Sequence, residues 1–108
     1  MGVVTVGTGT TLRALRGATT VERDDAASMT AAVRELVEAI VRANALDPAC
    51  VLSAIFSATP DLRAMYPAAV AREMGWGEVP MLCVQEMDVE GAPPRCVRLL
   101  LHLAVDGD

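Results

Sequence analysis

The residues of this 108-residue chain that could act on a charged small molecule are Arg16, Cys83, Glu86 and Arg98. All nine basic residues are arginine, whose planar guanidinium binds a carboxylate through two parallel hydrogen bonds. Without a lysine, Schiff-base chemistry through that residue is excluded. Arg98 would project from the middle of a strand, where a ligand-binding arginine is held rigidly. An arginine near a glutamate is also typical of an ordinary surface ion pair, so residue types alone leave both interpretations open.

The remaining reactive side chains do not favour nucleophilic or metal chemistry. His102 is the single histidine, and it falls inside an apolar strand pattern, which favours a strand residue over a catalytic base. The three cysteines, Cys50, Cys83 and Cys96, form no C-x-x-C pair. We therefore expect unpaired thiols, no metal site and a reducing, cytoplasmic location.

The composition excludes several classes of partner. Fourteen acidic residues against nine arginines give a net charge of −5, which argues against nucleic acid and anionic lipid. No apolar run approaches the ~18–20 residues that span a membrane, and the N-terminus lacks the features of a signal peptide. Hydrophobic residues make up 53% of this small chain, so we expect another subunit to cover part of its surface. A codon bias toward Ala and Val is the alternative explanation.

The clearest periodic signal predicts a helix over residues 26–43. Apolar residues recur along one face at helical spacing, whereas Glu38 and Arg42 have the favourable i, i+4 spacing on the other face. The acidic segment 22–25 precedes this helix and suits the positive end of its dipole. The apolar face is expected to pack on a sheet.

The last strand, over residues 95–105, alternates with period 2. Val97 and the following odd-numbered residues share an apolar face, while Arg98 and His102 share the other. The element order predicts one α/β domain over residues 1–108, an α+β sandwich with helices on one face of a mixed sheet. The other expected segments are a strand over 11–16, a turn over 17–20, a helical turn after Asp47-Pro48, a strand over 51–57 buried on both faces, a helix over 66–74, a strand over 79–84 and a loop over 86–94.

A series of sequence blocks resembles the AroH-class, monofunctional chorismate mutases. The blocks occur in the family's order and at nearly its spacing, from about residue 12 to residue 106. They are Arg16-Gly-Ala-Thr-Thr-Val-Glu22, Ser57-Ala-Thr-Pro-Asp-Leu62, Tyr66-Pro-Ala68, Arg72-Glu73, Val79-Pro80, Cys83-Val-Gln-Glu-Met-Asp-Val89 and Cys96-Val-Arg98. The resemblance implies the rearrangement of chorismate to prephenate in aromatic amino acid biosynthesis. This unimolecular reaction needs no nucleophile, metal or cofactor.

The resemblance also implies the roles of individual residues. Arg98 matches the family's cation beside the breaking C–O bond, and Arg16 matches an arginine at a substrate carboxylate. Glu86 and Cys83 match the positions that hold the substrate hydroxyl. The implied substrate-binding residues are Cys83, Tyr66, Met81 and Leu82, with Ala68 and Arg72 contributed by the adjacent subunit.

The family resemblance implies a homotrimer with a pseudo-α/β barrel at its centre and active sites between subunits. Such a trimer would cover the open face of the sheet. This sequence departs from the family at Ala69, where a lysine is common. It also departs after Asp108, where members usually continue with a strand that carries an active-site tyrosine, and then a tail. Residues 1–11 form an atypical N-terminal extension that could fill a sheet edge.

Two other functions compete with an active mutase. One is a catalytically weakened or non-catalytic small-molecule-binding trimer on the same scaffold. The other is a trimeric enamine/imine deaminase, whose arginine motif the block after Cys83 does not suit. The retained Arg16, Glu86 and Arg98 favour the mutase. We expect no separate regulatory domain.

Overall fold

The computed structural model describes residues 10–106, which form a four-stranded mixed sheet in the order β1-β4-β2-β3. β4 is antiparallel to both of its neighbours, and β2 is parallel to β3. Nearly all of the expected N-terminal extension, residues 1–11, lies outside the described residues, as does its suggested place at a sheet edge. The strands are β1 (Thr10–Thr20), β2 (Val51–Ala58), β3 (Met81–Gln85) and β4 (Cys96–Asp106).

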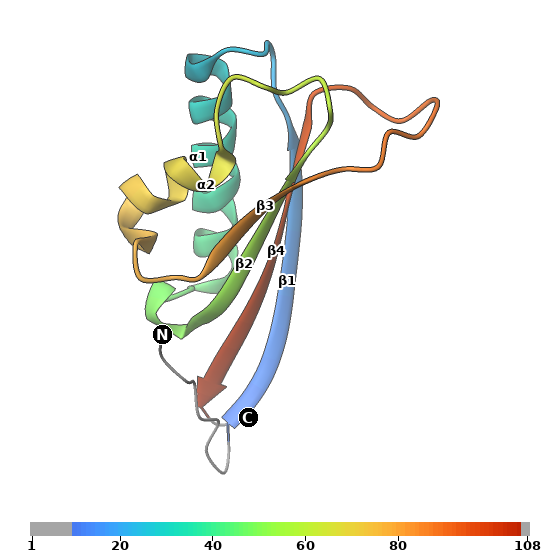
Figure 1. Ribbon diagram of the computed structural model, residues 1–108. Helices are drawn as coiled ribbons and strands as arrows, with labels where there is room; N and C mark the ends of the chain where they lie inside the picture. Colours follow the sequence, from blue (N-terminus) through green and yellow to red (C-terminus); the bar gives the residue numbers. More distant parts are fainter. Residues whose placement is uncertain (1–9, 107–108) are drawn as a thin grey trace.

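The helices lie on one side of this sheet, as Figure 1 shows for α1 and α2. Between them and the sheet lies an apolar core that includes Met29, Phe56, Trp76 and Leu99, each at most 2% exposed. This arrangement confirms the predicted α+β sandwich with helices on one face. The helical segments are α1 (Ala26–Asn44), the single turn η1 (Pro48–Cys50), α2 (Pro67–Ala71) and the wide turn η2 (Arg72–Trp76).

α1 confirms the helix predicted over residues 26–43. It begins after Asp25, whose carboxylate accepts a hydrogen bond of 2.7 Å from the backbone N–H of Ser28. This bond, made to the charged form, holds the pKa of Asp25 below its usual value. The helix ends at Ala45, which adopts a left-handed conformation (φ 47°). Its buried face consists of Met29, Val33, Leu36, Val37 and Ile40.

The alternation predicted for the last strand is also confirmed. Val97, Leu99, Leu101 and Leu103 of β4 are at most 5% exposed and face the helices. Arg98, Leu100 and His102 lie on the other face and are exposed. Among residues 10–106, no helix or strand covers that other face, which we call the open face (Figure 1).

The turn predicted over residues 17–20 is wrong, because β1 continues to Thr20 and pairs with β4 along its whole length. Gly17 lies where α1 packs closely on β1, and not in a turn. A Cβ at this position would lie 2.9 Å from Cδ1 of Ile40 and 3.0 Å from Cδ1 of Leu36. The missing side chain therefore lets α1 approach the strand closely.

One further expectation needs correction, and another differs only in helix type. The strand predicted over 51–57 is not buried on both faces in this chain, because Ala54 and Phe56 are buried while Ile55 on the open face is only half-buried. The helix predicted over 66–74 is present, but only α2 is α-helical, and η2 follows it directly as a π-helical turn. Gly75 within that turn has φ +97°, which glycine adopts without strain.

The other predicted segments occur with shifted ends. The helical turn after Asp47 is η1, and the strand predicted over 79–84 is β3, which begins two residues later, at Met81. Residues 86–94 form the expected loop, which extends away from the sheet in Figure 1. Within the described residues, no helix is long and apolar enough to cross a membrane.

Candidate active site

Arg98 lies at the centre of a row of residues across the open face. Its register partners are Ala18 on β1 and Ser57 on β2, and Ser57 is in turn opposite Val84 on β3. Side chains of directly opposed residues share a face of the sheet, so this row brings Ser57 beside Arg98. The sheet thus presents a guanidinium with a hydroxyl next to it, fixed on rigid strands.

Glu86 completes a polar cluster with these two residues. Its backbone N–H donates to the carbonyl of Ala58 (2.9 Å), which fixes the start of the loop after β3. Oε1 of Glu86 accepts a hydrogen bond of 2.5 Å from the Ser57 hydroxyl and lies 3.2 Å from Nε of Arg98. The side chains of Arg98 and Glu86 are 58% and 29% exposed in the single chain. We call Ser57, Glu86 and Arg98 the polar cluster.

The geometry of the polar cluster leaves specific groups free to bind a ligand. Both contacts use the same carboxylate oxygen, Oε1, so Oε2 retains its capacity to accept a hydrogen bond. Arg98 engages Glu86 through Nε, so its terminal nitrogens retain their N–H groups. The cluster therefore offers a donor fork and an acceptor side by side.

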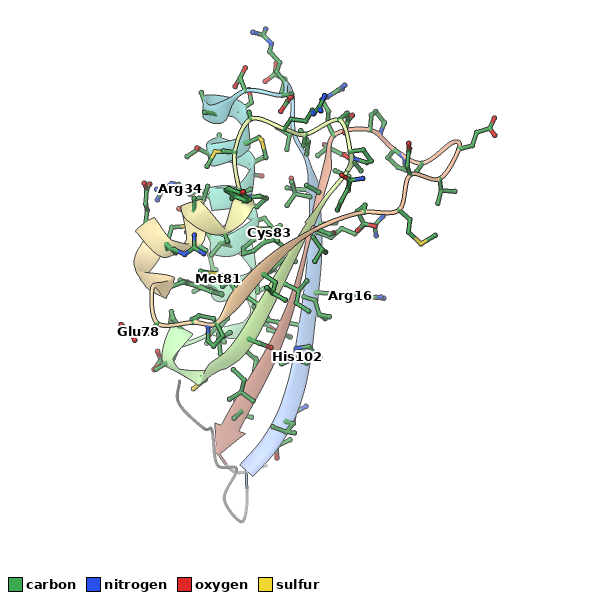
Figure 2. The ribbon with its side chains drawn as sticks, in the orientation of Figure 1. Arg16, Arg34, Glu78, Met81, Cys83 and His102 are labelled. Carbon is green, nitrogen blue, oxygen red and sulfur yellow. The ribbon has the colours of Figure 1, made fainter. Side chains whose placement is uncertain are left out.

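Arg16 lies on the same face, one strand away. It is opposite Leu100 in the register of β1 and β4, and it is exposed. Figure 2 shows Arg16 projecting away from the helices. Leu82 of β3 is also on this face and is 65% exposed. The open face thus carries Arg16, Leu82 and the polar cluster among exposed apolar side chains.

A second group of the expected residues lies around a cavity on the helix side of β3. The cavity has a volume of about 570 Å³ and is lined by Tyr66, Cys83 and part of the segment between β2 and α2. Cys83 lies opposite buried Phe56, and Met81 lies opposite buried Ala54, so both side chains lie on the face away from the polar cluster. Figure 2 labels Met81 and Cys83 on β3.

The other expected residues of this second group differ in exposure. Tyr66 is 73% exposed at the edge of the cavity, and Arg72 is exposed beyond α2. Ala68 is 2% exposed, with its side chain in the core of its own chain. The structure therefore separates the predicted residues into two groups: Arg16, Leu82, Glu86 and Arg98 on the open face, and Tyr66, Ala68, Arg72, Met81 and Cys83 on the helix side.

A network at the start of β4 positions the strand that carries Arg98. Arg95 has φ +47°, and its backbone N–H donates to Oδ2 of Asp61 (3.0 Å). The Thr59 hydroxyl donates to Oδ1 of Asp61 (2.5 Å). These hydrogen bonds, led by that from Thr59, hold the pKa of Asp61 below its usual value. The loop after β2 is thereby tied to the start of β4, three residues before Arg98.

Reasoning from the sequence missed two contributors to the site. Ser57 is part of a block that resembles the family, but only its register opposite Arg98 indicates a role. Asp24 belongs to the acidic segment before α1, and its carboxylate accepts hydrogen bonds from the N–H groups of Arg63 (2.8 Å) and Ala64 (2.9 Å). It thus holds the segment that lines the cavity.

The described residues contain no group of three or more His, Cys, Asp or Glu side chains placed to hold a metal ion. All three cysteines are free thiols. His102 is a strand residue, as predicted, and its Nδ1 lies 3.1 Å from the hydroxyl of Ser53.

Within residues 10–106, the protein is thus an α+β sandwich whose sheet is uncovered on one face and carries an arginine–glutamate cluster there. The sequence profile of the family described as chorismate mutase type I matches residues 12–108. This chain belongs to that family. The resemblance of its sequence blocks to the AroH-class chorismate mutases is thereby confirmed.

Individual relatives agree with the family assignment. The chain is 43% identical over 96 residues to chorismate mutase AroH from Bacillus subtilis (strain 168), covering 88% of this chain and 76% of that protein. It is 40% identical over 90 residues to chorismate mutase AroH from Thermus thermophilus, covering 82% and 74%. A solved chorismate mutase from Clostridium thermocellum superimposes with a TM-score of 0.85 at 38% identity, covering 89% of this chain and 86% of that one.

Proposed function

We propose that this chain catalyses the rearrangement of chorismate to prephenate, with Arg98 as the cation that stabilises the transition state. The observation that carries the proposal is the polar cluster, because it places a guanidinium with free terminal nitrogens beside a carboxylate with a free oxygen. Membership of the chorismate mutase type I family supports the substrate. The intact cluster favours this function over a non-catalytic binding protein on the same scaffold.

The reaction itself makes limited demands on the protein. It is a unimolecular pericyclic rearrangement, so the chain must hold chorismate in a compact, chair-like conformer. As the C–O bond breaks, negative charge develops on the ether oxygen. A fixed guanidinium beside that oxygen binds the transition state more strongly than the ground state, which lowers the barrier. Arg98 is held for this task by its strand and by Glu86.

Other residues bind the parts of chorismate that do not react. We assign Arg16 to one of the two substrate carboxylates, since it is an exposed arginine on the same face as Arg98. We assign Glu86 to the substrate hydroxyl, which would donate to the free Oε2. The overall charge of −5 does not oppose a dianionic substrate, because the field within an arginine-lined cleft dominates locally.

The active form that we propose is a homotrimer with sites between subunits. Within one chain, the cavity beside Tyr66 and Cys83 does not include Arg16, Glu86 or Arg98. A neighbouring subunit packed on the open face would bring its cavity to the polar cluster and join the two groups. Its packing would also bury exposed apolar side chains of the open face: Leu12 (62%), Leu82 (65%), Val84 (46%) and Leu100 (37%).

The test of this proposal is the loss of chorismate absorbance on addition of the purified chain, with identification of prephenate as the product. Sedimentation at micromolar concentration, measured on the same sample, gives the oligomeric state. We expect turnover by a trimer. A folded trimer that leaves chorismate unchanged would overturn the catalytic function, and an active monomer would overturn the shared site. The three free thiols fit a reducing compartment such as the cytoplasm, which remains a prediction.

A further inference from the structure

We propose that Ser57 is a positioning residue that fixes the Glu86 carboxylate and, through it, the guanidinium of Arg98. The inference rests on the proposed function, and it deepens that function by adding a residue that touches no reacting atom. Its basis is the hydrogen bond of 2.5 Å from the Ser57 hydroxyl to Oε1 of Glu86, the same oxygen that Arg98 contacts at 3.2 Å.

Glu86 needs such support because of its place in the fold. It is the first residue after β3, at the beginning of the loop over residues 86–94, so no strand pairing fixes its side chain. A glutamate side chain has several freely rotating bonds, and restraining them costs conformational entropy. Among residues 10–106, the contacts of its carboxylate are those with Ser57 and Arg98.

Ser57 is suited to supply that support. It lies in β2 between β3 and β4, opposite Val84 on one side and Arg98 on the other. Its hydroxyl is one bond from the Cβ of a rigid central strand, so its position varies little. A donor fixed in this way selects one orientation of the carboxylate. In that orientation, Oε2 and the terminal nitrogens of Arg98 can contact the same ligand.

Both contacts of the Glu86 carboxylate are made by the same oxygen. Because Ser57 and Arg98 both bind Oε1, the carboxylate cannot rotate without breaking both contacts. Of the carboxylate contacts within residues 10–106, removal of the hydroxyl would leave the ion pair with Arg98, and this pair is more than half exposed on the arginine side. The guanidinium would then sample orientations that do not face the developing charge.

The test compares Ser57→Ala with Ser57→Thr and with the matched control Ser53→Ala. Ser53 lies on the same strand and the same face, and its hydroxyl also has a side-chain partner, His102. It is four residues from Ser57 along β2, and its register partner His102 is four residues from Arg98 along β4. We expect Ser57→Ala to lower kcat about tenfold, in line with one charge-assisted hydrogen bond, and to raise KM by a smaller factor, through the contact of Glu86 with the substrate hydroxyl. Ser57→Thr, which retains the hydroxyl and suits a strand, restores most of kcat. Ser53→Ala keeps the parent kcat.

A second measurement separates positioning from a merely structural role. In a Glu86→Ala background, the further change Ser57→Ala should alter kcat by less than about twofold, because the carboxylate that the hydroxyl positions is gone. Equal effects of Ser57→Ala with and without Glu86 would overturn the inference, as would a parent-like kcat in folded Ser57→Ala. A parent chain that leaves chorismate unchanged would overturn the proposed function, and the inference with it. An active parent with an unaffected Ser57→Ala variant overturns the inference alone.

Discussion

The two faces of the sheet differ in whether this chain buries their side chains. On the helix side, Leu99 is 1% exposed and packs in a core that this chain builds by itself. On the open face, the adjacent Leu100 is 37% exposed, and Arg98 stands beside it with its terminal nitrogens free. Neighbouring residues of one strand thus belong to different environments because strand side chains alternate.

This difference separates the residues that fold the chain from those proposed to act on substrate. The helix side holds the apolar side chains whose burial stabilises a single chain. The open face holds a polar cluster among apolar side chains that remain exposed without a second subunit. Substitutions on the two faces should therefore have separable consequences.

The largest expected effects come from adding a charge to each face of β4. Leu99→Asp should prevent folding, because it buries an unpaired carboxylate in the core. Leu100→Asp should leave the chain folded but dissociate the proposed trimer and abolish turnover, because it places charge in the proposed subunit contact. Circular dichroism and sedimentation distinguish these results. A Leu100→Asp variant that remains an active trimer would contradict the proposed contact.

The next largest effect is expected for the cation itself. Arg98→Ala should lower kcat on the order of a few hundredfold, because a preorganised electrostatic donor is typically worth ~3–4 kcal/mol in the transition state. Arg98→Lys should not restore full activity, because lysine differs in reach and donor geometry. Steady-state kinetics on the two folded variants measures these changes in kcat. Turnover within about threefold of the parent, well below the loss expected for such a donor, would show that Arg98 is not the catalytic cation.

A smaller effect is expected for Arg16, on the neighbouring strand of the same face. Arg16→Ala should raise KM about tenfold and change kcat much less, because a carboxylate contact exists in both the ground state and the transition state. The same kinetic series reports both parameters. If kcat falls as far as in Arg98→Ala while KM stays constant, Arg16 acts on the reacting bond and the assigned roles must change.

The smallest expected effect concerns the helix layer, where Asp25 caps α1. Its pKa is lowered in the folded chain, chiefly by the hydrogen bond from the Ser28 N–H, so its charge stabilises the fold above its unfolded pKa. That contribution disappears as the pH falls through the lower, folded pKa, that is, below about pH 4. The unfolding free energies of the parent and Asp25→Asn, measured in urea, should therefore converge between neutral pH and acid. A gap that is constant with pH would contradict this assignment.

Much of the fold could be predicted from the sequence, because local periodicity carries it. α1 was predicted because its apolar face repeats at helical spacing, and β4 because Val97 to Leu103 alternate. The exposed position of Arg98 followed from the same alternation. The turn over residues 17–20 was predicted wrongly because a glycine can serve a bend or a close approach, and only the contact with Ile40 decides which.

The site could be predicted only in part. The residue types of Arg16, Glu86 and Arg98 fitted both a carboxylate-binding site and an ordinary surface ion pair, and the sequence blocks indicated the family. Ser57 went unnoticed because a serine in a strand has no chemical signal of its own. Its proposed role depends on a residue 29 positions further along the chain.

The sequence by itself determined the periodic elements, the composition of each face and the family, since these depend on residue order and type alone. The tertiary structure decided which distant residues meet. The order β1-β4-β2-β3 places Ser57 beside Arg98, and the start of the loop after β3 brings Glu86 to both. It also decided which face of β3 meets the helices, so that Cys83 lies opposite buried Phe56 and Leu82 lies opposite Ile55 on the open face. Such contacts arise from strand pairing between segments far apart in the chain, which no local pattern encodes.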